Sequence, residues 1–181
     1  MKKIVLLVLV LTFNSFAIYF DAGLGVGGAA SEVGNASIDD ACKGCDDYAV
    51  NLDIHFGGQI NERFWIAGGL EALGHRYEDS YNYIQLNTYL IGPKFIFYPV
   101  EHFHLSGSIG LAWTSNMTDI RGYDLYDGTG VALSLTAAFD TGIYNGALIG
   151  GRLFTSSVTL EENNKNLSST GFCVFVAFVH K

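Results

Sequence analysis

Residues 103–115, FHLSGSIGLAWTS, alternate between two kinds of side chain, and this alternation restricts the fold more than any other feature. A period of two is the pattern of a β-strand whose two faces meet different surroundings. One face carries the large apolar residues and one glycine: Phe103, Leu105, Gly107, Ile109, Leu111 and Trp113. The other face is built from serine, glycine, alanine, threonine and one histidine. Because it has almost no charge or bulk, we expect that face to line a narrow interior rather than water.

The same alternation recurs in about eight segments, and no segment after residue 17 keeps a convincing helical period. The large apolar sets begin at Ile18, Tyr48, Phe64, Ile84, Phe103, Val131, Ala147 and Phe172. In the fourth segment the apolar set is Ile84, Leu86, Thr88 and Leu90. Gly92 and Pro93 follow it, and a bulge is expected there because proline lacks the backbone donor. We therefore predict an all-β fold of eight strands, with no helix after the N-terminal segment.

The connections between these segments alternate in length. Short turns fall at 61–63, 99–102 and 141–145, and long polar loops fall at 31–47, 75–82, 115–128 and 156–168. All the long loops would then lie at one end of the fold, and both chain ends would lie at the other. This arrangement is typical of an up-and-down barrel that is inserted into a membrane from one side.

The N-terminal residues MKKIVLLVLVLTFNSFA have a basic start, a short apolar run and a small-x-small cleavage pattern at Ser15 and Ala17. They predict a secretory signal peptide, 1–17, followed by one domain, 18–181. A membrane anchor is disfavoured because the apolar run is shorter than the ~20 residues of a spanning helix. The formal net charge of −8 argues against a nucleic-acid partner.

Three architectures accommodate eight alternating strands, namely a soluble lipocalin-type barrel, a β-sandwich and an outer-membrane barrel. The first two expose a charged outer face, whereas only 15% of this chain is charged, against about 25% in soluble domains. Aromatic residues near the strand ends favour the third, because such barrels carry aromatic girdles at both membrane interfaces. They are Tyr48, Phe64, Phe97, Tyr98, Phe103, Trp113, Phe139, Tyr144 and Phe178. The predicted fold is an eight-stranded antiparallel up-and-down transmembrane β-barrel.

With its signal peptide, loop asymmetry and aromatic last segment TGFCVFVAFVHK, the chain resembles the small OmpA/OmpX-like outer-membrane β-barrel proteins. The resemblance covers the whole of 18–181. It implies an outer-membrane location with membrane lipid as the surrounding partner. Family members typically end on an aromatic residue, whereas here Val179, His180 and Lys181 follow Phe178.

The few charged residues on the small-residue face are candidates for a polar network inside the barrel. They are Asp21, Asp53, His55, Glu71, Asp140 and Arg152. Arg152 is the clear cation of this face, and Glu71 is its expected partner across the interior. An unpaired buried charge is costly, so such residues are expected to pair.

The first long loop contains the sequence DDACKGCDD. In an exported loop, Cys42 and Cys45 are expected to form a short-range disulfide, and Cys173 is expected to be a buried free thiol. The loop would hold four carboxylates together, and hard divalent cations prefer such oxygen ligands. Asp39, Asp40, Asp46 and Asp47 are therefore a candidate weak Ca²⁺ or Mg²⁺ site, and the alternative is a solvated acidic loop.

Enzyme signatures are sparse. His55, His75 and His104 alternate with serines, but no nucleophile motif singles out a triad. The sequence favours a non-enzymatic, monomeric barrel without a cofactor, which has a structural, adhesive or surface-binding role through its acidic loops. An open pore is not expected, because eight strands leave an interior just wide enough for side chains. The alternatives are a lipid A-modifying outer-membrane enzyme and a soluble periplasmic barrel that binds an apolar ligand.

Overall fold

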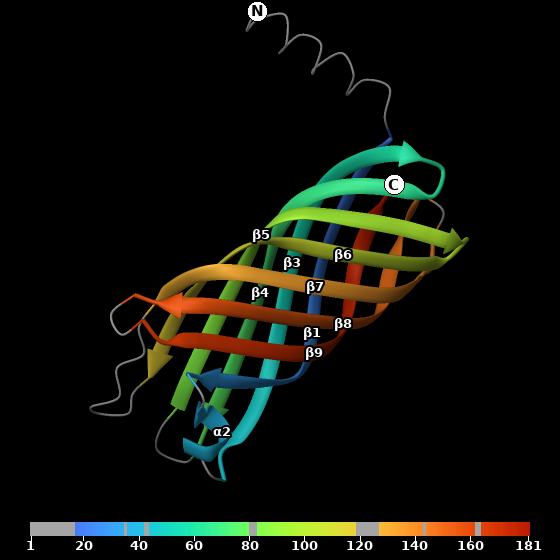
Figure 1. Cartoon of the computed structure of the whole chain (residues 1–181). Helices are drawn as coiled ribbons and strands as arrows, with labels where there is room; N and C mark the ends of the chain where they lie inside the picture. The colour runs from blue at the N-terminus through green and yellow to red at the C-terminus, as the bar shows by residue number, and fades with distance from the viewer. Residues whose placement is uncertain are drawn as a thin grey trace, which may run out of the picture.

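The computed structural model describes residues 17–34, 36–41, 44–79, 83–118, 127–142, 144–161 and 164–181. Eight long strands in these residues form one closed antiparallel barrel (Figure 1). They are β1 (Ile18–Val33), β3 (Asp46–Asn61), β4 (Phe64–Glu78), β5 (Tyr83–Val100), β6 (Phe103–Thr118), β7 (Gly128–Asp140), β8 (Asn145–Leu160) and β9 (Asn166–His180). Each pairs with the next along the chain, and β1 pairs with β9 to close the barrel. The predicted all-β, up-and-down barrel of eight antiparallel strands is confirmed.

Two short elements lie between β1 and β3, namely strand β2 (Ala36–Ser37) and helix α2 (Ile38–Ala41). The prediction of no helix was therefore wrong by one turn. This helical turn is stabilised by packing, because Ile38 is buried in an apolar cluster with residues of β4, β5, β8 and β9. Within the described residues, no helix is long and apolar enough to span a membrane.

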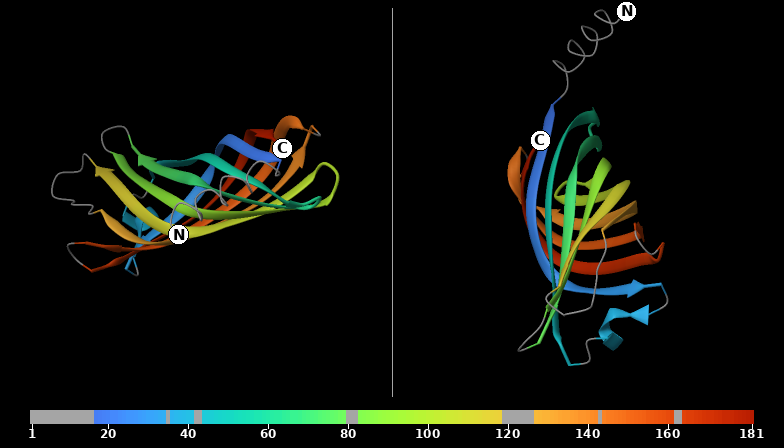
Figure 2. Two further views of the ribbon diagram at one scale, coloured as in Figure 1. Left: turned by 90° about the horizontal axis from the view of Figure 1, so that it is seen from above. Right: turned by 90° about the vertical axis from the view of Figure 1, so that its left-hand side faces the viewer.

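The two ends of the barrel differ. Both described chain ends and the short connections lie at one end, here called the turn end (Figure 1). Helix α2 and the strand ends that flank the longer connections lie at the other, here called the loop end. The views in Figure 2 show the tilted strands winding around one interior. Strands β1, β4, β6 and β8 run further toward the loop end than predicted, so the loops are shorter than expected.

Large apolar side chains on all eight strands point outward and form what we call the apolar belt. Representative members, one from each strand, are Leu24, Leu52, Ile66, Ile91, Leu111, Val131, Ile149 and Val174. Leu111, the most exposed of these, has 69% of its surface accessible. The intervening residues point inward and are mostly buried. Seven of the eight segments therefore present the faces that the alternation predicts.

The first half of β5 is the exception and corrects the prediction. Ile84, Leu86 and Leu90 are buried inside the barrel, whereas Gln85 and Asn87 are on the outer face. The reason is that this half of β5 lies beyond the apolar belt, toward the loop end. Other strands carry polar residues on the same outer zone, which we call the polar collar: Gln85, Asn87, Ser157, Thr159, Asn166, Ser168 and Thr170.

The predicted bulge at Gly92 and Pro93 is also absent. Pairing between β4 and β5 runs through Gly68↔Pro93 without a shift, and pairing between β5 and β6 keeps one register on both sides of this point. The irregularities lie instead near the turn end, between Gln59 and Asn61 and between Phe97 and Val100. A single missing donor is tolerated because the pairs on either side hold the register.

Aromatic pairs lie near both edges of the apolar belt. Phe64 and Phe97 stack near the turn end with ring centroids 4.6 Å apart. Tyr89 and Trp113 stack where the belt meets the polar collar, with centroids 5.2 Å apart. Such girdles are expected at the two interfaces of a transmembrane barrel.

Candidate functional site

The centre of the barrel interior holds a cluster of buried charges, here called the interior network: Asp21, Asp53, His55, Glu71, Lys94 and Arg152. Lys94 from β5 donates to Asp21 of β1, with Nζ 2.7 Å from Oδ2. The Tyr19 hydroxyl donates to the same carboxylate at 2.5 Å. His55 Nδ1 lies 2.8 Å from Asp21 Oδ1, so this carboxylate links three strands.

Arg152 anchors the other side of the network. Its Nη1 donates to Asp53 Oδ1 and to Asn51 Oδ1, both at 2.5 Å. Its Nε donates to Thr136 at 3.0 Å, and its guanidinium carbon lies 4.7 Å from the centre of the Phe175 ring. A guanidinium offers several donors in a fixed plane, which suits a site with several acceptors.

The expected pairing of Arg152 with Glu71 was therefore wrong. Glu71 accepts a hydrogen bond from Ser108 at 2.5 Å and lies 3.3 Å from His55 Nε2. Asn51 and Asp53 occupy successive inward positions of β3, so one guanidinium nitrogen reaches both. The alternation along each strand identified the inward face, but it did not determine which side chains meet across the interior.

Lys94 is the member that the sequence pattern did not reveal, and it is a second cation on the inward face beside Arg152. The strand face was misassigned in the first half of β5, and the expected bulge obscured the second half. A usable signal was present, because a lysine in the middle of a spanning strand is costly on the lipid face. Because of this cost, Lys94 is expected to point inward. Ile84 and Leu86 lie an even number of residues from Lys94 on the same strand, so they are expected to point inward as well.

The interior network is closely balanced in charge. Three carboxylates face two permanent cations, and a proton on His55 would make the cluster neutral. Oxygen and nitrogen atoms of Asp21, Asp53 and His55 lie within 4.8 Å of one another, a spacing that would suit a metal ion. The ammonium of Lys94, however, lies 3.3 Å from His55 Nδ1 and repels a second cation there.

Small residues make room for these side chains. A Cβ added at Gly23 would lie 2.7 Å from Asp53 Oδ1, and one added at Gly69 would lie 2.5 Å from His55 Cδ2. Large buried side chains fill the interior along the barrel, and these include Arg152, Tyr19, Tyr77, Lys94 and Phe154. The arrangement can brace eight strands against one another, and it occupies the space that a pore would need.

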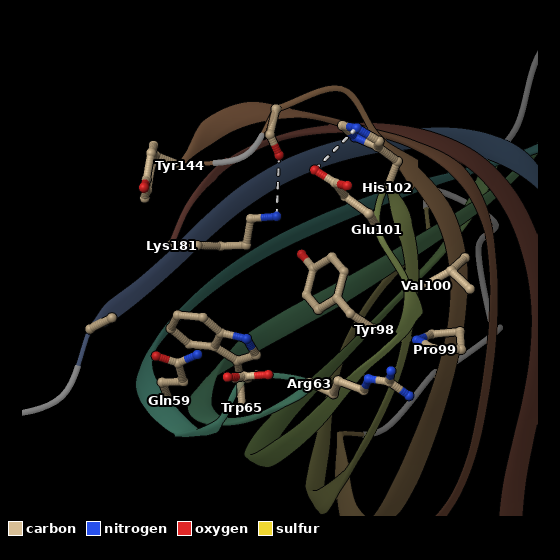
Figure 3. A pocket seen from close by; sticks show the side chains of 13 residues that line it. Gln59, Arg63, Trp65, Tyr98, Pro99, Val100, Glu101, His102, Tyr144 and Lys181 are labelled. Carbon is tan, nitrogen blue, oxygen red and sulfur yellow. Dashed lines mark hydrogen bonds and ion pairs between the residues drawn. The ribbon is translucent and has the colours of Figure 1, made fainter.

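Asp140, the sixth predicted member, is separate from this network. It lies at the turn end, where Tyr98 donates to its Oδ2 at 2.9 Å and Lys181 Nζ donates to the same atom at 2.7 Å. Lys181 also reaches the carbonyl of Gly142 (Figure 3). The predicted network thus divides into a central cluster and a separate contact at the turn end that holds Lys181.

A cavity of about 590 Å³ opens at this end of the barrel (Figure 3). Trp65 and Tyr98 are buried in its wall, and Arg63, His102 and Tyr144 lie nearer its rim. Its size is within the range of small-molecule sites. Charges of both signs line it, because Glu62 and Glu101 face the cavity with Arg63 and Lys181. This mixture does not select one class of ligand.

One serine, one histidine and one aspartate lie in series at the loop end. Ser31 Oγ is 3.2 Å from His75 Nδ1, and His75 Nε2 is 3.3 Å from Asp47 Oδ2. The order resembles that of a hydrolytic triad. Ser31 is only 1% exposed, and its hydroxyl also contacts Ser169 at 3.0 Å. A substrate would have to enter the barrel to reach this hydroxyl.

The other predicted sites lie in the first connection at the loop end and at the start of β3, except for Cys173 of β9. Asp40, Asp46 and Asp47 are exposed, whereas the Asp39 side chain is outside the described part of the structure. The divalent-cation site therefore stays a prediction. Cys45 is disulfide-bonded and Cys173 is a free, buried thiol. Cys42 lies outside the described residues, as does 1–16 of the predicted signal peptide.

Solved structures share this fold at low sequence identity, and two of them illustrate the match. Ail, the attachment invasion locus protein of Yersinia pestis, solved in complex with the heparin analogue sucrose octasulfate, is 13% identical with a TM-score of 0.58, and the match covers 90% of this chain and 99% of Ail. Neisserial surface protein A is 14% identical with a TM-score of 0.57, and the match covers 91% of this chain and 96% of that protein. No protein-family model and no curated protein sequence matches the chain.

These likenesses, together with the closed barrel and its apolar belt, define the class of protein. The chain has the fold of a small outer-membrane β-barrel, similar to that of the OmpA/OmpX-like proteins. Its apolar belt is the surface that faces lipid.

Proposed function

We propose that this protein is a non-enzymatic outer-membrane barrel, exported by its N-terminal signal peptide, that acts through the acidic surface of its loop end. The observation that carries the proposal is the filled interior, where the interior network joins β1, β3, β4, β5 and β8. A barrel without an open channel offers partners its outer surfaces. The role is then structural, adhesive or surface-binding.

The charge of the loop end indicates the partners. Its described and exposed acidic residues are Glu32, Asp40, Asp46, Asp47, Asp79, Asp127 and Glu161. Arg76 and Lys165 are the basic residues described there. Complementary charge steers and selects partners, so this surface favours cationic ones, including divalent cations. A sulfated sugar such as the one in the Ail complex is anionic and is disfavoured by the same argument.

A binding comparison tests the surface role. The folded barrel in nanodiscs is titrated with a polylysine peptide, with Ca²⁺ and with sucrose octasulfate. We expect binding of the cationic probes that weakens with added salt, and no binding of the sulfated sugar. The variant Asp46→Asn/Asp47→Asn should weaken the cationic binding, whereas Glu62→Gln at the turn end should not. Equal binding in both variants would exclude this part of the loop end as the site.

The location and the closed interior are tested separately. The protein should remain with outer membranes after a high-salt wash, whereas a soluble periplasmic barrel would be released. External protease should cut the loop-end connections of intact cells. In planar bilayers the barrel should give no conductance steps, and stable channels would contradict the filled interior.

The series Ser31, His75 and Asp47 supports one alternative, a lipid A-modifying enzyme. Lipid A from cells that carry the protein, the variant Ser31→Ala or no protein separates the two functions. We expect three identical profiles. A change that requires both the protein and Ser31 would replace the surface role with enzymatic activity.

A further inference from the structure

The outer surface of the barrel has a hollow that none of the functions considered above would use. It lies on β5 to β9, within the apolar belt, and has a volume of about 640 Å³. Its floor includes Gly107, Ala137 and Gly151, positions at which the alternation elsewhere places large apolar residues. Phe95 stands on the β5 side and Phe172 stands on the β9 side.

The strand register explains why the surface is hollow at this place. Ala137 of β7 pairs with Gly151 of β8, and Gly107 of β6 pairs with Leu135. Two small residues are therefore in direct register, and a third lies one strand away. The Phe172 ring comes within 3.0 Å of a Cβ added at Gly151, so larger side chains would intrude on the hollow. We call this hollow the belt groove.

The occupant follows from where the belt groove lies. The apolar belt is in lipid, where the groove cannot fill with water at low cost and an extended peptide would leave backbone groups unsatisfied. A second copy related by a two-fold axis through the groove would place one hollow against the other and leave a void. A flexible apolar chain fits without either cost.

The position of the groove along the barrel axis identifies the leaflet. Gly107 follows the β5–β6 turn by a few residues, and Ala137 lies just before the end of β7 at Asp140. Both are near the turn end. In outer-membrane barrels short turns are periplasmic, so the groove meets the periplasmic leaflet, which is built of phospholipid.

We propose that the belt groove binds one acyl chain of a phospholipid from the periplasmic leaflet. The proposal rests on the membrane placement given above, but not on any role of the loop end. The ring of Phe172 and the side chains of Phe95 and Leu153 form the walls of the groove. Because Gly107 and Gly151 have no side chains, the groove is deep enough for an acyl chain. Dispersion contacts hold the chain in this position longer than on the rest of the belt.

Photo-crosslinking tests the proposal on the folded full-length barrel. The probe is a phosphatidylethanolamine with a diazirine in the middle of one acyl chain, diluted into phosphatidylethanolamine and phosphatidylglycerol vesicles. Labelled residues are mapped by peptide mass spectrometry. We expect labelling of Phe95, Leu135 and Phe172 severalfold above that of Leu52 and Ile54, which lie on β3, on the side of the barrel opposite β7.

Filling the groove should remove this preference. The variant Ala137→Leu places a large side chain in the floor, and labelling of the groove residues should fall to the level of the rest of the belt. Gly68→Leu is the matched control, because Gly68 also faces outward and a Cβ there meets only one atom within 4 Å, at 3.9 Å. Heat-modifiable migration on gels shows that each variant has folded. Gly107→Leu is the second filling variant if Ala137→Leu does not fold.

The remaining outcomes each contradict a separate statement. Uniform labelling around the belt overturns the groove site but leaves the membrane placement intact. Absence of label from every belt residue overturns the membrane placement itself. Protein–protein crosslinks through the groove residues would assign the hollow to a second copy. Preferential labelling by a diazirine-bearing lipid A confined to the outer leaflet would overturn the choice of leaflet.

Discussion

The two halves of β5 follow one alternation with opposite chemistry. Between Tyr83 and Leu90, the apolar Ile84, Leu86 and Leu90 point inward and the polar Gln85 and Asn87 point outward, as in a soluble barrel. From Ile91 to Tyr98, Lys94 is buried inside while Ile91 and Phe95 are exposed outside. The outer face thus changes solvent along one strand, from water at the polar collar to lipid at the apolar belt.

This difference shows how much a period of two can predict. It identifies the two faces of a strand, but it does not say which solvent each face meets. Inside the loop end, Tyr77, Ile84, Leu86 and Leu160 form an apolar cluster with Ile38 and Leu167. Inside the belt, the interior network takes that place. The interior is therefore apolar at the loop end and mixed within the belt, where Leu148, Phe154 and Phe175 are buried as well.

The first prediction tests the charged zone and has the largest expected effect. Arg152→Ala removes the donor to Asp53 and Asn51 and leaves a buried carboxylate without its main partner. Breaking a buried ion pair in this way costs about 3–5 kcal/mol of unfolding free energy. The measurement is the denaturant midpoint of the barrel in detergent or lipid.

Two variants control for the loss of Arg152. Arg76→Ala removes a partly exposed arginine paired with Glu78 and should leave the midpoint almost unchanged. The double variant Arg152→Ala/Asp53→Asn should recover part of the loss, because the buried charge is removed as well. If Arg152→Ala were as mild as Arg76→Ala, Arg152 would have to face water.

The second prediction tests the apolar zone. Leu86 is 1% exposed and lies inside the loop end, so Leu86→Ala should cost about 3 kcal/mol through lost burial and the cavity that it leaves. Leu111→Ala is the comparison, since Leu111 is 69% exposed on the apolar belt and lipid fills the space of the lost atoms. Equal midpoints for the two variants would remove the distinction between the zones.

The third prediction locates the boundary between collar and belt from the outside. Ile109→Lys puts a charge on the lipid face near the middle of β6 and should cost about 2–3 kcal/mol. Gln85→Lys puts the same charge on the polar collar and should cost close to nothing, because that face meets water. Folding free energies in lipid vesicles give both values. A large cost at Gln85 would mean that the belt extends to the loop end.

Much of this fold follows from the sequence, because alternation and connection length are local properties. They specified the strand number, the order and the inward placement of Asp21, Asp53, His55, Glu71 and Arg152. They did not determine the contacts between residues that are far apart in the sequence. The partner of Arg152 depends on which side chains meet across the interior, and no local pattern reports that.

The misassigned half of β5 has a different origin. Ile84, Leu86 and Leu90 look like a lipid-facing set because they are apolar, and the sequence does not show where the membrane ends. Lys94 held the missing information, since it shares parity with them and is costly in lipid. Helix α2 escaped prediction because a single turn is too short to show a helical period.

The last prediction concerns the boundary itself and has the smallest expected effect. Tyr89 and Trp113 are directly paired across β5 and β6, and their rings lie 5.2 Å apart at an angle of 17°. Stacked aromatic pairs contribute about 0.5–1.5 kcal/mol beyond the area that they bury. A double-mutant cycle with Tyr89→Leu and Trp113→Leu should give a coupling energy within this range in lipid vesicles. The Phe64 and Phe97 pair, stacked at 4.6 Å near the turn end, is the matched cycle and should give a similar coupling. If only the turn-end pair were coupled, Tyr89 and Trp113 would act as separate anchors at the interface, and the boundary would depend on their positions rather than on their contact.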